Sequence, residues 1–254
     1  MYRAATACLI PRVPKPAFLP FFASLVLLLG AASLATAAEP TGPSPTIAWT
    51  AQIVHPIAAR AAPRDGARVV ARVTTYTAFS RRSQRLLVLS PAQTDPATGR
   101  RWVLVRLTER PNGARGFVPL DAVRLRATRN RIVVRVAART VELWRAGRRV
   151  ARFAAAVGTT GTPTPTGMFA VQDPVPAGPS QRSYLGPYII TLTAHSAVLK
   201  SFMGGNGLVA INGTNAPGLL GQAVSHGCIR VSNEAVTRLY AIAAPGTPVE
   251  VLPY

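Results

Sequence analysis

Short apolar runs separated by turn residues fill most of the chain after residue 45, and this pattern constrains the fold more than any other feature. In the first block, clusters such as Pro63-Arg64-Asp65-Gly66 and Pro111-Asn112-Gly113 divide the runs, and no stretch has helical periodicity. The runs predict β-strands at Ile47–Val54, Arg68–Val73, Leu86–Leu89, Trp102–Leu107 and Phe117–Val118. We therefore expect an all-β module over residues 46–126.

A second block with longer runs begins at Asn130. Its first runs alternate apolar and polar residues around the turn at residues 145–148, which predicts an antiparallel meander. The strands expected are Ile132–Val136, Val141–Trp144, Val150–Val157, Met168–Val171, Tyr188–Thr193, Leu208–Ile211 and Val249–Leu252. One helix is predicted, with Asn233 as N-cap and with apolar residues at helical spacing before Pro245-Gly246. The fold class is mainly β, and this block spans 130–253.

Residues 1–38 have the three parts of a cleavable signal peptide. Three basic residues precede the uncharged apolar run Phe18–Leu34, and the small residues Ala35-Thr36-Ala37 follow. Residues 16–38 are also long enough to cross a bilayer of ~30 Å, so an uncleaved anchor is the alternative. Both interpretations place the protein in the periplasm, the cell wall or the medium. Residues 39–45 are rich in proline and are expected to form a short stiff linker.

The chain is strongly basic. Without residues 1–38 it keeps 26 of the 29 basic residues and all nine acidic ones, which gives a net charge of +17. A field of this sign attracts polyanions, and outside a cell these are anionic wall polymers or a membrane surface. We do not expect nucleic acid as a partner, because the basic residues are scattered and are not clustered with aromatic ones.

Cys228 is the only cysteine that remains after the export segment, which contains Cys8. An unpaired thiol on an exported chain is a dimer bridge, a buried inert residue or a reactive group, and we favour the last because Gly227 precedes it. In an extended segment, His226, Cys228 and Arg230 share one face, and the base and the cation then lower the thiol pKa.

The second block resembles an L,D-transpeptidase catalytic domain of the YkuD type. The matching pieces, in chain order, are Val157-Gly158, Thr162–Phe169, Gly186-Pro187-Tyr188, Gly213-Thr214-Asn215, Ser225–Arg230 and Gly246-Thr247-Pro248. The resemblance implies a mixed, mostly β fold and crosslinking of peptidoglycan stem peptides. It also implies that the Cys228 thiolate attacks the bond between meso-diaminopimelate and the terminal D-alanine, and that an amine of another stem or of a carrier protein resolves the thioester.

The first block resembles a bacterial SH3-like domain. The similarity rests on Gln84–Leu89, Trp102–Arg106, Arg110–Gly113 and Gly116–Pro119. The resemblance implies a small barrel that binds the wall or positions the protein on it, and the alternative is a packing domain with no ligand of its own.

Further site residues follow from the acyl-transfer chemistry and the resemblance. An acyl transfer needs a nucleophile, a proton carrier and oxyanion donors, so we assign Cys228 as nucleophile and the backbone N–H groups around Gly227 as oxyanion donors. Ser225 orients a donor, and Arg230 either holds a substrate carboxylate or has a structural role. Gly213 and Thr214 complete the predicted substrate-binding set.

Asn212 is the main departure from the family pattern. Members of the family usually carry the proton-carrying histidine at this position, and an asparagine cannot take a proton at working pH. His226 is then the base nearest to Cys228 in sequence, and His195 serves only if the fold brings it close. Three explanations stay open: His226 substitutes, the enzyme is slow, or the domain is a wall-binding protein without turnover.

Other classes fit this sequence less well. A papain-like arrangement places a histidine after the cysteine, and no histidine follows Cys228. One cysteine and three scattered histidines do not match a zinc-binding spacing, and His55 stands alone after a strand. We expect neither a metal nor a cofactor.

Overall fold

The computed structural model describes residues 39–201 and 205–254. The predicted signal peptide or anchor, residues 1–38, lies outside the described residues. Within those two ranges, no helix is long and apolar enough to cross a membrane. Ala38–Tyr254 forms one compact unit, and residues 39–45 contain no helix or strand.

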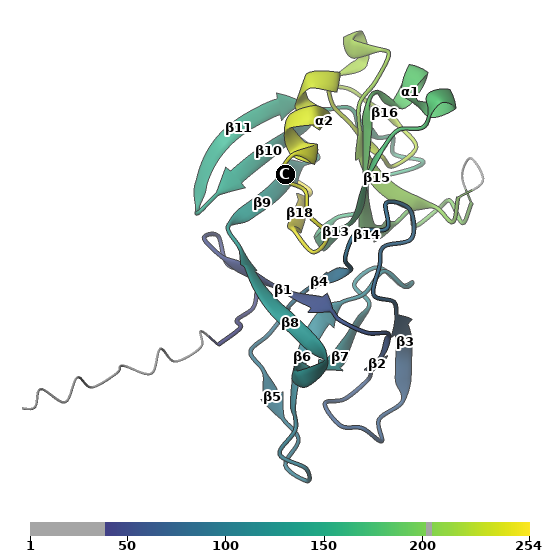
Figure 1. Ribbon diagram of the computed structural model, residues 1–254. Helices are drawn as coiled ribbons and strands as arrows, with labels where there is room; N and C mark the ends of the chain where they lie inside the picture. Colours follow the sequence, from purple (N-terminus) through teal and green to yellow (C-terminus); the bar gives the residue numbers. More distant parts are fainter. Residues whose placement is uncertain (1–38, 202–204) are drawn as a thin grey trace, which may run out of the picture. The chain divides into compact units, whose positions relative to one another are not determined.

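The first half of this unit is made of eight strands (Figure 1). One sheet has the order β4-β1-β8 and a second has the order β3-β2-β7-β6-β5. The strands are β1 (Ala48–Ile53), β2 (Ile57–Arg60), β3 (Val69–Val73), β4 (Arg85–Leu87), β5 (Gln93–Thr94), β6 (Arg101–Arg106), β7 (Arg115–Pro119) and β8 (Val123–Thr128). A short 3-10 helix, Leu120–Ala122, connects β7 to β8. Alternate residues of these strands, such as Val103 and Val105, form a separate hydrophobic core.

The second half contains an eight-stranded mixed sheet with the order β11-β10-β9-β18-β13-β14-β15-β17 (Figure 1). Its strands are β9 (Asn130–Arg135), β10 (Thr140–Arg145), β11 (Arg148–Ala154), β13 (Gly167–Pro176), β14 (Tyr188–His195), β15 (Leu208–Asn212), β17 (Ile229–Arg230) and β18 (Pro248–Leu252). The pairs β9–β18 and β15–β17 are parallel, and the other neighbours are antiparallel. The predicted meander is β9-β10-β11.

Smaller elements complete this half. The strands β12 (Val157–Gly158) and β16 (Ala223–Ser225) pair in parallel, and a 3-10 helix covers Pro217–Leu219. Helix α1 is Pro179–Leu185 and helix α2 is Asn233–Tyr240. Helix α2 packs against β14 and β15 (Figure 1) and buries Ala235, Val236 and Leu239 in the core.

The mainly β class is confirmed, and two details of the expected helices are wrong. The N-cap of α2 is Ser232, whose hydroxyl accepts the amide hydrogen of Ala235 at 3.1 Å, so the predicted cap Asn233 is instead the first helical residue. Helix α1 was not expected. It has seven residues and buries none of them, so it leaves no apolar periodicity in the sequence.

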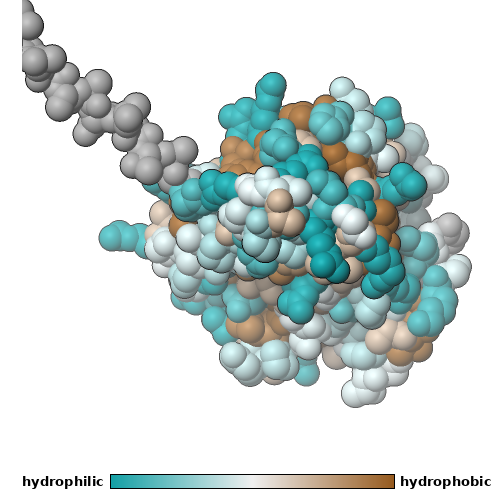
Figure 2. Space-filling model, turned by 90° about the horizontal axis from the view of Figure 1, so that it is seen from below, coloured by the Kyte–Doolittle hydropathy of each residue, from teal (hydrophilic) through white to brown (hydrophobic). Residues whose placement is uncertain are grey.

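The surface seen in Figure 2 is mostly hydrophilic, and its hydrophobic areas are small and separate. Large apolar side chains are nevertheless exposed in a few places, and the most exposed of those before the C-terminus is Phe79, at 61%.

Candidate active site

Cys228 lies in the loop between β16 and β17. The chain bends at His226 and Gly227, and Gly227 has a φ of +109°, which side chains rarely tolerate. The segment is therefore not extended at these residues, and Cys228 lies in a loop, one of the two placements predicted. Strand alternation does not place His226 beside the thiol.

Ser225 holds this loop in shape. Its hydroxyl donates to the carbonyl of Cys228 at 2.5 Å and accepts the amide hydrogen of Gly227 at 3.2 Å. Ser225 is buried, and its hydroxyl is used inside the loop rather than directed at a ligand. The Gly227 amide is also engaged, so of the two amides proposed for the oxyanion only that of Cys228 is not used by Ser225.

Two threonines of the segment after β12 clamp the Cys228 loop from outside. Thr162 donates its hydroxyl hydrogen to the carbonyl of Ser225 at 3.1 Å, and Thr164 donates to the carbonyl of Gly227 at 3.0 Å. Thr164 also accepts the amide hydrogen of Gly158 at 2.9 Å. A Cβ atom at Gly158 would lie 2.3 Å from the carbonyl oxygen of Thr162, so the segment fits only against a glycine. This role of the threonines was not predicted, although the Thr-Pro-Thr-Pro-Thr run marks the segment in the sequence.

A cavity of about 280 Å³ opens at Cys228. Asn212, Ala210, Thr191 and Tyr184 are among the residues that line it, and none of its lining residues is charged. Of the predicted site residues, only Cys228 and Asn212 line this cavity; His226, Ser225, Gly227, Arg230, Gly213 and Thr214 do not.

Burial raises the pKa of the Cys228 thiol above its ordinary value. A backbone hydrogen bond from Ala210 and the positive charge of Arg230 act in the opposite direction but do not outweigh the burial. The pKa lowering expected from the sequence is therefore not what the structure gives. The half-buried thiol is protonated at neutral pH and must lose its proton before it can attack.

Asn212 ends β15 inside the same cavity. Parallel pairing places Asn212 opposite Arg230 and Ile211 opposite Ile229, which directly follows Cys228. Asn212 is 2% exposed, and its side-chain amide donates to the carbonyl of Gly213 at 2.7 Å. It can orient a group in the cavity, but it cannot carry a proton.

The two histidines considered as bases lie elsewhere. His226 is exposed on the bend. His195 is buried and lines a separate cavity of about 470 Å³ with Arg110 and Lys200. Burial, and to a smaller extent the charge of Arg110, lowers the pKa of His195, so its imidazole is neutral at pH 7. No imidazole of the described residues lines the Cys228 cavity.

Three other predicted residues, Arg230, Gly213 and Thr214, do not line the cavity at Cys228. Between residues 39 and 254, apart from 202–204, no hydrogen-bond or ion-pair partner is found for the Arg230 guanidinium. A Cβ atom at Gly213 would lie 2.2 Å from the side-chain oxygen of Asn233, which accepts the amide hydrogen of Thr214 at 3.1 Å. Gly213 and Thr214 therefore join β15 to helix α2, and this contact accounts for both residues without a ligand.

The part of the chain that the structure describes contains no group of three histidine, cysteine, aspartate or glutamate side chains placed to hold a metal ion.

Comparison with known proteins finds a similarity in the second half of the chain. Residues 129–251 match the family model of the L,D-transpeptidase catalytic domain, YkuD. Two curated relatives, each named as a candidate L,D-transpeptidase YkuD, come from Bacillus licheniformis and Bacillus subtilis. The first is 37% identical over 125 residues, which is 48% of this chain and 66% of the relative. The second is 35% identical over 122 residues, which is 47% of this chain and 64% of the relative.

The chain thus spans just under two thirds of the length of these relatives. A solved L,D-transpeptidase from Mycobacterium smegmatis is 17% identical, covers 66% of this chain and 89% of its own, and has a TM-score of 0.39, which is too low to carry an argument. Over residues 129–251, the chain is therefore similar to the L,D-transpeptidase catalytic domain of the YkuD type.

Proposed function

We propose that this protein is a cysteine-dependent L,D-transpeptidase that acts on peptidoglycan stem peptides. The observation that carries the proposal is the thiol of Cys228, which faces an uncharged cavity within a domain of this family. A cysteine that reaches such a cavity is positioned for acyl transfer, and a large excess of positive charge suits an anionic wall.

The reaction has two steps. In the first, Cys228 loses its proton and its sulfur attacks the carbonyl on the L-centre of meso-diaminopimelate. The carbon–nitrogen bond to D-alanine breaks, D-alanine leaves as an amine with one added proton, and a thioester remains. In the second, the amine of another stem or of a carrier protein attacks the thioester, loses a proton and regenerates the thiol.

Donors for the oxyanion and for the substrate carboxylate come from the Cys228 loop, from the end of β15 and from β17. The backbone amide of Cys228 is the donor closest to the reacting sulfur along the chain, and the amide of Asn212 is a second polar group in the cavity. Arg230 follows Cys228 by two residues, and its charge acts on the thiol. A guanidinium without a partner in the described structure suits a substrate carboxylate.

The proton carrier is the weakest part of this site. The raised pKa of Cys228 and the neutral side chain of Asn212 both oppose formation of the thiolate. We assign the proton transfer to His226, which lies on the same loop and is exposed to solvent. The expected consequence is slow acylation.

The proposal extends to the rest of the chain. Residues 1–38 direct export or anchor the protein, and the module over residues 46–126 is an SH3-like domain that positions the catalytic domain on the wall. The positive charge adds attraction to anionic wall polymers or to the membrane surface.

The test uses a carbapenem-type β-lactam, which is a strained acyl donor. Intact-mass spectrometry of residues 39–254 should show a covalent adduct on the wild-type protein and none on Cys228→Ala. An adduct that persists in Cys228→Ala removes Cys228 as the nucleophile. No adduct on the wild type, together with retained binding of wall peptide, makes the protein a wall-binding protein without turnover.

A further inference from the structure

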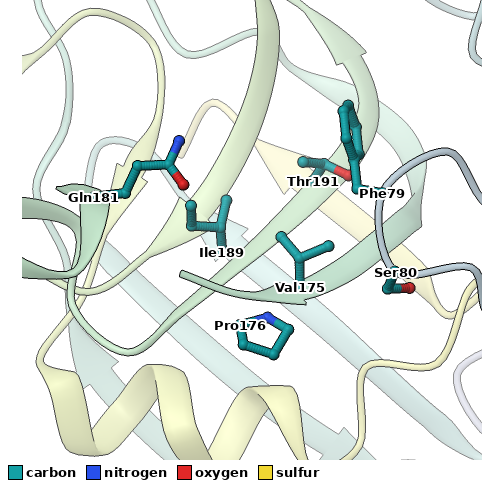
Figure 3. A pocket seen from close by; sticks show the side chains of 7 residues that line it. All are labelled: Phe79, Ser80, Val175, Pro176, Gln181, Ile189 and Thr191. Carbon is teal, nitrogen blue, oxygen red and sulfur yellow. The ribbon is translucent and has the colours of Figure 1, made fainter. Parts of the chain in front are cut away.

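A second cavity, of about 360 Å³, continues the cavity at Cys228 (Figure 3). Four residues line both: Phe79, Gln181, Ile189 and Thr191. Because they share these walls, the two cavities form one groove, which we call the Phe79 groove. Its part beyond Cys228 is bounded by Val175 and Pro176 of β13.

Two lining residues of this groove, Phe79 and Ser80, come from the N-terminal module, and Phe79 lines both cavities. Phe79 belongs to the loop 77–80, between β3 and β4 of the N-terminal module, and Figure 3 shows its ring beside Thr191. The side chain is 61% exposed, so it contributes little to a hydrophobic core. An aromatic ring that is exposed at a groove offers a large, rigid apolar surface to a ligand.

The backbone around Phe79 is fixed to the catalytic domain. Asp173 of β13 is 0% exposed, and one of its carboxylate oxygens accepts the amide hydrogens of Phe79 at 2.8 Å and Ser80 at 3.0 Å. The Ser80 hydroxyl donates to the other oxygen. A buried carboxylate is tolerated only when hydrogen bonds replace its water, and here three donors from one loop do so. The exposed ring is therefore held by a strongly bound backbone.

The chemistry of the groove selects its occupant. Its shared walls are one aromatic, one aliphatic, one amide and one hydroxyl side chain, and no charged residue lines either cavity. Such walls fit uncharged backbone amides and small apolar side chains better than charged groups. The continuity with Cys228 identifies the occupant as the chain that the thiol acylates, rather than an unrelated partner.

We propose that Phe79 determines specificity for the peptide donor by packing against it, and that Asp173 is a positioning residue that holds Phe79 there. This inference rests on the proposed function and extends it, because the N-terminal module then supplies part of the substrate-binding groove.

The test measures binding apart from chemistry. In a Cys228→Ala background, the Kd of a synthetic stem tetrapeptide is compared for three proteins: the parent, Phe79→Ala and Tyr76→Ala. Tyr76 is a matched control, because it is 49% exposed in the same module and lines neither cavity. We expect Phe79→Ala to weaken binding about tenfold and Tyr76→Ala to leave it unchanged, since an aromatic contact is worth roughly one factor of ten. Equal Kd values for the parent and Phe79→Ala, or no binding by the parent, would overturn the inference.

A second measurement separates this inference from the proposed function. With Cys228 intact, Phe79→Ala should raise KM for the tetrapeptide more than it changes kcat, and it should affect the smaller β-lactam less than the peptide. Asp173→Asn should also raise KM for the tetrapeptide, because the loop that carries Phe79 is then held less firmly. A failure of the wild type to form any adduct defeats the proposed function but leaves the Kd comparison valid. A loss in kcat alone defeats the assignment of Phe79.

Discussion

Two loops meet at the Phe79 groove, and different chemistry holds each of them. Neutral hydroxyls of Ser225, Thr162 and Thr164 hold the Cys228 loop. The loop around Phe79 is held by the carboxylate of Asp173. A negative charge beside the thiol would raise the pKa of Cys228 beyond what burial already does. A carboxylate therefore holds the wall of the groove, whereas hydroxyl groups hold the nucleophile.

The largest expected effect is on the nucleophile. Cys228→Ala should abolish D-alanine release from the tetrapeptide and leave the melting temperature nearly unchanged, because one half-buried thiol contributes little packing. The measurement is chromatographic detection of D-alanine, with thermal unfolding as the control. Release of D-alanine by the variant at the wild-type rate would mean that the Cys228 loop does not hold the reacting group.

The next effect concerns the missing imidazole. Asn212→His places a titratable group in the cavity and should raise the acylation rate by ~10²-fold, the usual gain from a positioned proton carrier. The rate is followed with the β-lactam, and the double variant Cys228→Ala/Asn212→His is the control for reaction elsewhere. No gain in a protein that melts normally would mean that proton transfer does not limit the acylation rate, which would contradict the slow acylation expected with His226.

The two loops should also differ in what they contribute to stability. Asp173→Ala leaves two backbone amides and one hydroxyl of the Phe79 loop without their acceptor, so we expect a loss of ~1–3 kcal/mol or more in the free energy of unfolding. Urea denaturation measures this. An unchanged midpoint would contradict the account of how the loop is held.

Removal of one clamp from the Cys228 loop should have a smaller effect. Thr164→Val keeps the shape but leaves the Gly158 amide and the Gly227 carbonyl without their partner, which costs about 1–3 kcal/mol. It should also slow acylation. Thr166→Val is the matched control, because Thr166 is exposed in the same segment, and both rate and stability should stay unchanged there. Equal behaviour of the two variants would remove the role of Thr164.

The pH dependence of alkylation gives the smallest expected shift. A raised pKa in the folded protein means that the thiolate forms only as the pH rises past the ordinary thiol range, so iodoacetamide should react slowly with Cys228 at pH 7 and faster at higher pH. His226→Gln removes the proposed proton carrier, so the alkylation profile of this variant should differ from that of the wild type. If the two profiles coincide, His226 does not act on the thiol.

The sequence predicts the fold better than it predicts the site. Most strands are visible as apolar runs. Strand β8 was missed because it is not an apolar run, although its alternation of apolar residues with Arg124, Arg126 and Thr128 is typical of a half-buried strand. Short β2 and β5 were missed for lack of length. Cys228 and Asn212 were found because their residue types are chemically informative.

The roles of Thr164 and Asp173 depend on contacts between distant segments. Thr164 reaches Gly227 across 63 positions, and Asp173 reaches Phe79 across 94. No local pattern encodes such pairs, because a threonine or an aspartate at these positions is equally suited to a turn or a surface. The raised pKa of Cys228 was likewise hidden, since burial comes from the folded neighbours and not from the adjacent residues.

Whether Cys228 carries the acyl group is decided by detecting the acyl-enzyme and locating the modified residue. The wild-type protein is mixed with stem tetrapeptide, quenched with acid, digested and analysed by mass spectrometry. We expect the proteolytic fragment that contains Cys228 to gain the mass of the tripeptide acyl group. Hydroxylamine, which cleaves thioesters, should remove this added mass. An acyl group on another residue, or D-alanine release with Cys228 never modified, would contradict the account.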